Sequence, residues 1–504
     1  MTGSVPLGAR GRVSVRALVT APRRDEIVDI DRLLSAIGPA DLLESADRSG
    51  WSYLIPHDLS PGVLVDDGER SWLELRDGTV HALGTDPLAA LDAVTEALGL
   101  RPDAIPDEGP SMPFRGGLVG ALAYELGDRI LPRIGSRPRS ADQPDMMLRV
   151  AGTVIAVSRE RDHAFVVVDE GIQRCSGDVV HEELEERCLR ADVRPMSQSR
   201  DGDGPAPTTA ITSLPHAEYA VAVEEALATI GRGDAYQVNI TQRLSAPFSE
   251  GLTALYRRMR AASPASHSAL LPQAGLASIS PERFLDVVAG VVTTDPIKGT
   301  RRRADDPVLD AALADDLTTS TKDRAENVMV VDLERNDLGA VCVAGSVEVP
   351  TLLELRALPT VWHLISRVRG TLRPGTTYAD LLRATFPSGS VTGAPRIAAM
   401  QSIRQLEPVA RGWYCGAVGW IGNGSAALSV AIRTATLRDG LATYGAGGGV
   451  VADSDPDDEI AESLDKAVPF LTAVGATHTT GRSAGVARSA TLPATSAPGP
   501  MEDR

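Results

Sequence analysis

The sequence predicts a large protein of mixed helices and strands, built as one α/β or α+β unit or as more than one domain. Its 504 residues exceed the usual ~100–200 residues of a single domain. Hydrophobic residues make up 43% of the chain, which is enough for a large core. Short β-like runs dominate up to about residue 190, and helical patterns follow after residue 215. Both kinds of secondary structure are therefore expected.

Short apolar runs predict the strands. Arg12–Thr20 alternates like a half-buried strand, and no apolar secretory core follows it, which favours a strand over a transit peptide. Further β-like runs occupy Trp51–Ile55, Trp72–Leu75, Gly117–Leu122, Phe165–Val168 and Val287–Thr294.

Three predicted helices carry acidic or apolar residues at helical spacing. His216–Ile230 has apolar residues three and four apart. Thr321–Leu333 follows a Thr/Ser cluster that can cap its first turn. Asp455–Leu471 begins with an aspartate in the N-cap position and a proline in the first helical position.

Composition divides the chain into four parts. Residues 1–195 form an amino-terminal region, and residues 196–213, rich in Gly, Pro, Ser and Asp, are predicted to be a linker or long surface loop. Residues 214–474 are dense in motifs. Residues 475–504 are mostly Ala, Thr, Ser, Gly and Pro, cannot bury a core, and are predicted to be a disordered tail.

Charge and cysteine content exclude several classes of function. A net charge of -17 argues against a nucleic-acid or anionic-membrane binder, because both need a cationic surface. No run of eighteen apolar residues predicts a transmembrane helix. The four cysteines form no C-x-x-C pair, so neither a disulfide framework nor a zinc site is indicated, and we expect a cytoplasmic protein.

Two acidic pairs lie on two of the predicted helices. Asp323 and Glu326 are three residues apart, as are Glu459 and Glu462, so each pair shares one helix face. Magnesium prefers carboxylate oxygens and often bridges to an anionic substrate. Two such helices facing each other would hold Mg²⁺. The alternative is a solvated face whose acids suit the helix dipole.

Two single residues are candidates for catalytic roles because of their local sequence context. Lys298 lies between a β-like run and a Gly-Thr turn, where a lysine in a cleft can act as a nucleophile. Glu282 follows another β-like run, and a partly buried glutamate can be held protonated as a general acid. The alternatives are a surface lysine in a turn and a salt bridge at a strand end.

Two glycine-rich segments can approach an anion with their backbone amides. Gly445–Gly449 lies between apolar residues, without the spacing of a dinucleotide fingerprint. Phe386–Pro395 is rich in Gly, Ser and Thr. Ordinary tight turns are the alternative for both.

The order of these segments and their amino-acid sequences resemble those of the chorismate-binding enzymes. This family includes anthranilate synthase component I, aminodeoxychorismate synthase component I, isochorismate synthases and salicylate synthases. Leu42–Ala46 and Pro113–Tyr124 match more loosely. The strongly matching stretches span about half of the chain: Ala235–Leu244, Ser280–Leu285, Pro296–Arg301, Lys322–Cys342, Trp362–Val368, Phe386–Met400, Gly416–Trp420, Ala431–Ala435 and Gly445–Ser454.

The resemblance implies an α+β fold like that of anthranilate synthase component I, with two packed, mostly antiparallel sheets surrounded by helices. Both halves of the chain contribute strands in this family. The boundary near residue 200 can therefore be a loop inside one interleaved fold.

The resemblance also implies roles for individual residues. Glu326 and Glu462 are expected to bind Mg²⁺, with Asp323 and Glu459 as near or water-mediated partners. Glu282 is the expected general acid. His363 matches the family's active-site histidine, and Ser45 matches a tryptophan pocket that can be structural or empty. The expected substrate contacts are Gln237, Gly299, Thr300, Thr392, Tyr414, Arg433, Gly447, Gly448 and Gly449.

Two positions distinguish the subfamilies. Isochorismate and salicylate synthases resemble one another in a lysine base where this chain has Gln237, so an enzyme that activates water is disfavoured. Anthranilate synthases have a small residue where this chain has Lys298, whereas aminodeoxychorismate synthases have lysine. In the latter, the lysine is thought to attack C2 of chorismate before ammonia adds at C4.

The resemblance therefore implies aminodeoxychorismate synthase component I, which makes 4-amino-4-deoxychorismate for p-aminobenzoate, in folate or secondary metabolism. No cysteine elbow of a glutaminase is visible in the sequence, so we expect a separate glutamine amidotransferase subunit to supply ammonia. The alternatives are anthranilate synthase component I and a non-catalytic scaffold partner.

Overall fold

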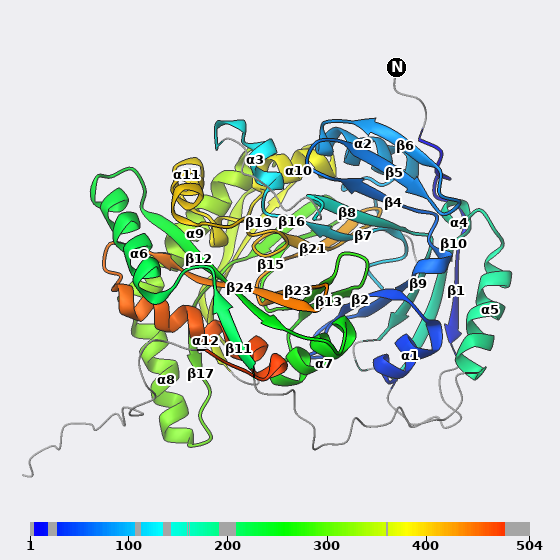
Figure 1. The fold of residues 1–504 in the computed structure, drawn as a ribbon. Coiled ribbons are helices and arrows are strands. Elements are labelled where there is room, and N and C mark those ends of the chain that lie inside the picture. The colour runs from blue at the N-terminus through cyan, green and yellow to red at the C-terminus, as the bar shows by residue number, and fades with distance from the viewer. Residues whose placement is uncertain are drawn as a thin grey trace, which may run out of the picture.

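Two large β-sheets pack face to face, and the helices lie outside them (Figure 1). The structure is a computed structural model that describes residues 5–18, 28–105, 112–134, 143–158, 160, 162–190, 208–358 and 361–478. The predicted α+β class, with two mostly antiparallel sheets, is confirmed.

The first sheet is antiparallel except where β11 pairs in parallel with β25. A short strand, β20 (Gly393–Ala394), also pairs with β12. In spatial order its strands are β1 (Val13–Leu18), β10 (Ala164–Asp169), β9 (Thr153–Val157), β3 (Ser52–Pro56), β2 (Ala40–Glu44), β13 (His267–Leu271), β14 (Leu276–Ser280), β23 (Thr434–Arg438), β24 (Leu441–Val450), β12 (Gln237–Pro247), β11 (Thr208–Thr212) and β25 (Ala476–His478).

The second sheet is antiparallel throughout its described pairs, and β18 (Glu348–Ala357) joins it through β19. In spatial order its strands are β17 (Ile297–Arg302), β19 (Val361–Thr371), β16 (Val291–Asp295), β15 (Arg283–Val288), β22 (Ser425–Val430), β21 (Ala417–Ile421), β7 (Gly117–Leu122), β8 (Met146–Ala151), β4 (Gly62–Asp66), β5 (Ser71–Leu75) and β6 (Val80–Gly84).

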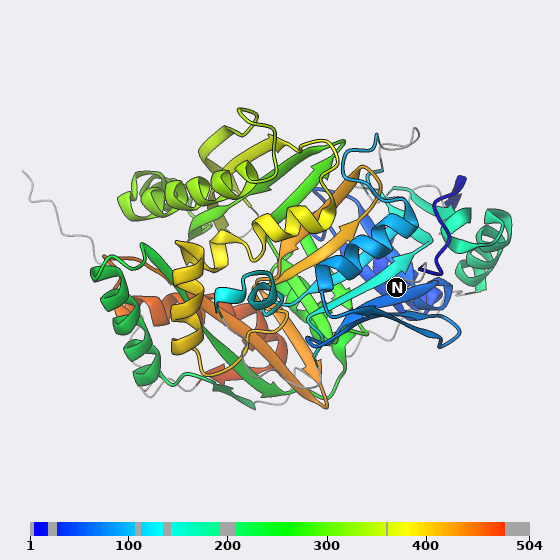
Figure 2. The same ribbon diagram turned by 90° about the horizontal axis from the view of Figure 1, so that it is seen from above.

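The helices flank the sheets on opposite sides. In the view of Figure 1, α2, α3, α10 and α11 lie above the sheets, and α7, α8 and α12 lie below; Figure 2 shows the upper group from above. Their bounds are α1 (Ile30–Ile37), α2 (Pro87–Leu98), α3 (Leu126–Ile130), α4 (Glu170–Gln173), α5 (Gly177–Arg190), α6 (His216–Gly231), α7 (Leu252–Ala262), α8 (Pro307–Thr319), α9 (Thr321–Gly339), α10 (Tyr378–Thr385), α11 (Arg396–Leu406) and α12 (Pro456–Val474), with the single turns η1 (His57–Leu59), η2 (Pro132–Ile134) and η3 (Gly389–Val391).

Both sheets contain strands from either side of residues 196–213. In the first sheet β2 pairs with β13, and in the second β7 pairs with β21. Residues 196–207 of the predicted linker lie outside the described residues, and its remaining part includes β11. Of the predicted tail, residues 475–478 are described and include β25.

Aromatic and aliphatic side chains fill the space between the two sheets. Tyr53 from β3 contacts Phe114 edge to face, with ring centroids 5.5 Å apart, and Trp420 from β21 lies 4.8 Å from Phe114. Such ring pairs add to the free energy gained by burying their area. Val119 and Val418 extend this core along paired strands. The apolar faces of the two sheets therefore bury one another.

The local sequence signals predicted the first residues of the helices more accurately than the limits of the strands. α6, α9 and α12 begin as predicted; Ser320 caps α9 and Asp455 caps α12, and α9 and α12 continue beyond their predicted ends. The run Val287–Thr294 is not one strand, because a turn at Ala289 and Gly290, both with positive φ, divides it between β15 and β16. None of the described helices has the length and apolarity needed to cross a membrane.

Candidate active site

A cavity of about 1010 Å³ opens between the carboxyl half of the first sheet, β17 and β19 of the second sheet, and helices α9 and α12. It is large enough for a small organic substrate. Twelve of the residues expected at the site line it: Glu282, Lys298, Gly299, Thr300, Asp323, Glu326, His363, Tyr414, Arg433, Gly447, Gly449 and Glu462.

Lys298 reaches the cavity from β17, where the pairing with β19 shifts register between Ile297 and Thr300. Gly299 allows this shift, because its φ is +80° and an added Cβ would lie 2.7 Å from the Leu317 side chain. The Lys298 Nζ donates a hydrogen bond to the Ser390 carbonyl oxygen at 3.1 Å. A backbone carbonyl thus holds the amine in the cavity wall.

Glu282 is 5% exposed at the end of β14, where its backbone carbonyl accepts a hydrogen bond from the Val430 amide. Burial raises the pKa of its carboxyl to about 7; a hydrogen bond with the Ser390 side chain and the charges of Lys298 and Lys466 act in the opposite direction. A carboxyl with this pKa can give a proton near neutral pH.

Glu326 on α9 and Glu462 on α12 line the same cavity but differ in charge environment. Burial raises the pKa of Glu326 to about 7, and the carboxylates of Glu462 and Glu459 add to the effect. The pKa of Glu462 is lowered chiefly by Lys466, whose Nζ lies 2.7 Å from Glu462 Oε1.

The two other acidic residues expected near a metal are engaged by cations. Asp323 accepts a hydrogen bond from Arg301 at 3.0 Å. Glu459 Oε1 accepts from Ser454 at 2.7 Å and from Lys322 at 3.2 Å, while its Oε2 is buried without a hydrogen-bond partner. Within the described residues, no three His, Cys, Asp or Glu side chains are gathered closely enough to hold a metal ion.

Arg433 and His363 also bring polar groups to the cavity. The Arg433 Nη1 donates to the Ser263 hydroxyl at 3.1 Å, which fixes the guanidinium at the cavity. His363 pairs with Thr300 across β17 and β19. Burial, reinforced by Arg433 and Arg356, lowers the pKa of His363 to about 3, and its Nδ1 has no hydrogen-bond partner. The imidazole is therefore neutral at physiological pH.

The alternative that Gly445–Gly449 is an ordinary tight turn is wrong, because these residues belong to β24 and pair with β12. Glycine is needed at several of these positions because a side chain would clash with neighbouring residues. A Cβ on Gly445 would lie 2.1 Å from the Tyr414 ring, and one on Gly449 would lie 1.9 Å from Gln237 Nε2. The Gly447 carbonyl accepts from Lys466 at 2.9 Å, and the N–H and C=O of one strand residue point to the same side. The Gly447 amide therefore also points away from β12.

Replacing Gly445 by alanine should displace the Tyr414 ring and raise the KM of the enzyme for its substrate. Overpacking of this kind typically costs about 1–3 kcal/mol of stability. Thermal unfolding and initial-rate kinetics would measure both effects. Gly231→Ala is the matched control, because nothing lies within 4 Å of that Cβ at the end of α6. An unchanged KM in Gly445→Ala would contradict the role of this glycine.

Five expected residues lie outside the cavity lining. Gln237 is buried, and neither polar atom of its side chain has a hydrogen-bond partner. The Thr392 hydroxyl donates to the Ser388 carbonyl at 3.0 Å. A Cβ on Gly448 would lie 2.8 Å from Glu459 Oε2, so Glu459 packs against the glycine strand β24 at Gly448. The fifth is Ser45, in the amino-terminal region.

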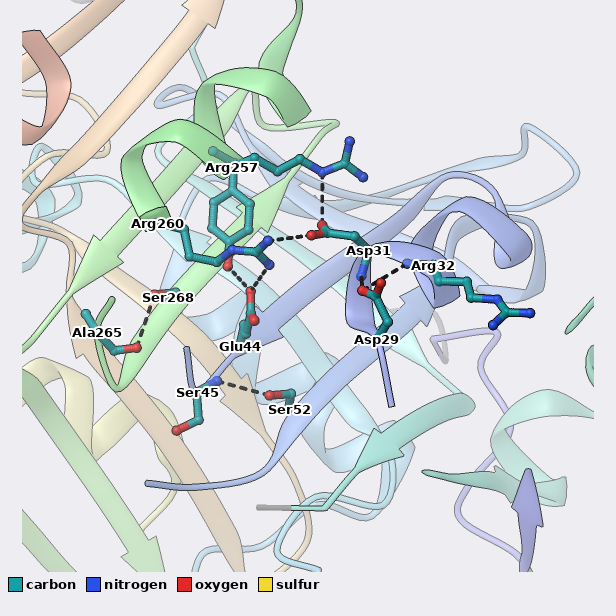
Figure 3. A network of polar contacts seen from close by, with 11 residues as sticks. Asp29, Asp31, Arg32, Glu44, Ser45, Ser52, Arg257, Arg260, Ala265 and Ser268 are labelled. Carbon is teal, nitrogen blue, oxygen red and sulfur yellow. Dashed lines mark hydrogen bonds and ion pairs between the residues drawn. The ribbon is translucent and has the colours of Figure 1, made fainter. Parts of the chain in front are cut away.

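Ser45 is engaged within its own turn. Its hydroxyl donates to Asp47 at 3.0 Å and accepts from the Gly50 amide at 2.8 Å, and its backbone amide donates to Ser52. Figure 3 shows the neighbouring Glu44, which accepts from Arg260 at 2.9 Å. This ion-pair network ties β2 to α7.

Some residues of the site were not foreseen from the sequence. Lys466 lies four residues after Glu462, and a Glu-to-Lys pair at this spacing on a helix is a recognisable signal. Ser390 lies inside the Phe386–Pro395 motif, but the motif alone gives no reason to choose it. Ser263 contacts Arg433 only through the tertiary fold, so no local pattern could identify it.

Comparison with known proteins identifies relatives over most of the chain. The sequence profile described as chorismate binding enzyme matches residues 64–472. The chain is 38% identical over 387 residues to aminodeoxychorismate synthase component 1 of Salmonella typhimurium, covering 76% of this chain and 81% of that protein. It is 34% identical over 458 residues to anthranilate synthase component 1 of Geobacillus stearothermophilus, covering 86% and 88%.

The fold matches a solved structure of the same group. The crystal structure of anthranilate synthase component I from Streptococcus pneumoniae aligns with a TM-score of 0.72 at 29% identity, covering 84% of this chain and 92% of that one. Sequence profile, relatives and fold agree over most of the chain, which therefore belongs to the chorismate-binding enzyme family.

Proposed function

We propose that the chain is component I of aminodeoxychorismate synthase, which converts chorismate and ammonia to 4-amino-4-deoxychorismate. Relatives of that name support the proposal, among them the Salmonella protein. The single observation that carries it is Lys298, whose Nζ lies in the cavity wall on the Ser390 carbonyl. A small residue at this position could not form a covalent bond to the substrate.

In the proposed reaction, the neutral Lys298 amine attacks C2 of chorismate while the 4-hydroxyl departs. Glu282 gives its proton to that hydroxyl, which leaves as water. Ammonia then adds at C4, the bond between C2 and Lys298 Nζ breaks, and the free lysine is restored. Two easier displacements thus replace one difficult displacement. The raised pKa of Glu282 supports its role as the general acid.

The two substrate carboxylates require cationic and neutral hydrogen-bond donors. Arg433, Thr300 and Gly447 line the cavity, and the Tyr414 ring lies against Gly445 of β24. We assign these groups to carboxylate binding. His363 lies beside Thr300 as a neutral imidazole, so it can donate a hydrogen bond without adding charge.

The carboxylate oxygens of the acidic residues at the cavity suit Mg²⁺ as a bound ion. Glu326 and Glu462 line one cavity from two helices, and Glu459 holds a buried carboxylate oxygen without a partner. Oxygen ligands of this kind suit Mg²⁺. A bound Mg²⁺ would neutralise one substrate carboxylate and offset the negative charge of the site. Glu326 and Glu462 would hold the ion, with Asp323 and Glu459 in supporting positions.

Mg²⁺ should stabilise the protein through Glu326. At 100 times its Kd, a ligand that binds only the folded state adds about 2.7 kcal/mol, which thermal unfolding and calorimetric titration can measure. Glu326→Gln should lose this stabilisation. The control Glu348→Gln should keep it, since Glu348 is exposed on β18 and pairs with Arg369. Equal stabilisation of wild type and Glu326→Gln would remove Glu326 from the metal site.

Identification of the product tests the proposed function. The chain should convert chorismate to aminodeoxychorismate with ammonium and Mg²⁺ at mildly alkaline pH, as identified by mass and chromatography. Activity with glutamine should require an added glutamine amidotransferase subunit. A relative's name containing "component 1" supports the expectation of a partner.

Anthranilate synthase component I is the second candidate, because the chain is 34% identical to such a protein over 86% of its length. Formation of anthranilate with release of pyruvate would establish it. No turnover, even with the glutaminase subunit present, would favour a non-catalytic scaffold.

A further inference from the structure

An ion pair joins two walls of the cavity at its solvent-exposed rim. Arg302 is the last residue of β17, Asp465 lies on α12, and both residues line the cavity. Their side chains are 68% and 72% exposed, and the Arg302 Nη2 donates to Asp465 Oδ1 at 3.4 Å. The pair therefore lies at the boundary between the cavity and bulk water.

The faces of β17 and α12 that carry this pair continue into the cavity. From Thr300 to Arg302 the pairing with β19 is regular, so these two residues lie on one side of β17, about 7 Å apart along the strand. Asp465 lies three residues after Glu462, so these two residues share a face of α12. A carboxylate held at Arg302 is therefore one short step along β17 from Thr300, a group assigned above to carboxylate binding.

The balance of charge at the cavity differs from that of the whole protein. The chain has 50 lysines and arginines against 67 aspartates and glutamates. Among the described residues that line the cavity, seven are lysine or arginine and six are aspartate or glutamate. A cleft with low-dielectric walls focuses the field of such local charges. A substrate with two carboxylates is therefore attracted to the cavity in preference to the rest of the surface.

The ion pair of Arg302 can exchange its partner more easily than those of its neighbours in the sequence. Arg301 donates to Asp323 at 3.0 Å. Arg303 donates to Asp310 at 2.8 Å and also packs on an aromatic ring. The side chains of Arg301 and Arg303 are 28% and 32% exposed, against 68% for Arg302. Because a long, exposed ion pair contributes little to stability, another carboxylate can replace the aspartate on Arg302 at little cost.

We propose that Arg302 is an entry site for the substrate: it binds a carboxylate of the incoming dianion, which displaces Asp465, and then releases it inward along β17. This inference rests on the proposed function, in which the substrate is chorismate. No covalent bond changes in the exchange, and the guanidinium carries a carboxylate before and after it. The substrate then moves to Thr300 and Arg433, and Asp465 returns to Arg302 behind it.

Rapid mixing of the protein with chorismate in the absence of ammonia would test the entry site. The association rate constant can be followed by tryptophan fluorescence, because Trp362 lies under the Arg303 guanidinium, 4.3 Å from ring centroid to Cζ. We expect Arg302→Gln to lower this constant roughly 3- to 10-fold, as loss of a steering charge does. The kcat for chorismate consumption should not change, because the carboxylate has left Arg302 before the chemical steps. Arg302→Lys, which keeps the charge, should retain most of the wild-type association rate.

Variants of Asp465 give an effect of the opposite sign. Asp465→Asn frees Arg302 and should raise the association rate constant about 2-fold. The same change made in Arg302→Gln should bring no gain, because the aspartate acts through Arg302. All of these differences should shrink as ionic strength rises from about 0.02 M to about 0.3 M, since salt screens exposed charges.

Arg335→Gln is the matched control for loss of one exposed arginine. Arg335 pairs with Asp332 at 3.1 Å and is 50% exposed, and it lies about 20 Å further along α9 than the cavity-lining Lys322. This variant should associate with chorismate at the wild-type rate. Thermal unfolding would verify that all variants are folded.

Three outcomes would overturn the proposal. An unchanged association rate in Arg302→Gln would make the pair an ordinary surface contact. Faster association in both Arg302→Gln and Asp465→Asn would show that the pair only obstructs entry. A kcat lowered together with the association rate would place Arg302 in the chemical steps. The association rate does not depend on which product forms, so formation of anthranilate, or no turnover, would refute the proposed function and leave this test valid.

Discussion

Replacing Lys298 by alanine should reduce the formation of aminodeoxychorismate by roughly 10³-fold or more, the scale on which loss of a nucleophile lowers kcat. The amine lies on the Ser390 carbonyl in the cavity wall, and a methyl group cannot attack C2 of chorismate. Intact-protein mass spectrometry of the wild type with chorismate but no ammonia should reveal an adduct of chorismate less water. The adduct should be absent from Lys298→Ala.

Lys322→Ala is the matched control for this variant. Lys322 also lines the cavity, but its Nζ pairs with Glu459 at 3.2 Å. We expect a raised KM for chorismate and an intact ability to form the adduct. If Lys298→Ala kept its turnover, or if the adduct mapped to Lys322, the covalent mechanism assigned to Lys298 would be wrong.

Replacing Glu282 by glutamine should lower kcat by about 10²–10⁴-fold, because glutamine cannot protonate the departing hydroxyl. The wild type should also show a characteristic dependence on pH. The acid form of Glu282 is present below its pKa of about 7, so the rate should fall as pH rises through that value. Kinetics measured from pH 5.5 to about 9 should show this fall in rate, the alkaline limb of the pH profile, in the wild type. The limb should be absent from the variant.

Glu348→Gln, on the exposed edge strand β18, serves again as the control and should keep the limb. Glu282→Asp supplies a second test, because it retains an acid at a shorter reach and should keep a reduced but pH-dependent rate. An unaltered pH profile in Glu282→Gln would assign the limb to another group, of which the buried Glu326 is the first to examine.

The parts of the structure that depend on local chemistry were predictable from the sequence. α9 and α12 begin at capping residues that the sequence identifies, so Glu326 and Glu462 could be placed on helix faces before their surroundings were known. The Gly-Thr turn expected after Lys298 is not present, because Lys298 and Gly299 lie within strand β17; the glycine signals only the positive φ at Gly299 that accompanies the register shift.

The parts that depend on long-range packing were not predictable from local pattern. The sequence left a tight turn open for Gly445–Gly449 because glycine favours turns, whereas in β24 these glycines make room for Tyr414 and Gln237 from elsewhere in the fold. The engagement of Asp323 by Arg301 and the link between Ser388 and Glu334 likewise join separate elements. Such contacts between distant elements cannot be predicted from the periodicity of the sequence.

Strands from the first half of the chain pair with strands from the second half, and this constrains the order in which the protein can fold during synthesis. β7 must await β21 and β2 must await β13, so neither sheet is complete when the first half of the chain leaves the ribosome. Until then, the edges of β2 and β7 offer unpaired backbone groups to other chains. Because α12 follows every strand except β25, Glu462 and Lys466 join the cavity among the last groups to arrive. A nascent or truncated chain therefore carries Lys298 and Glu282 well before it has a complete site around them.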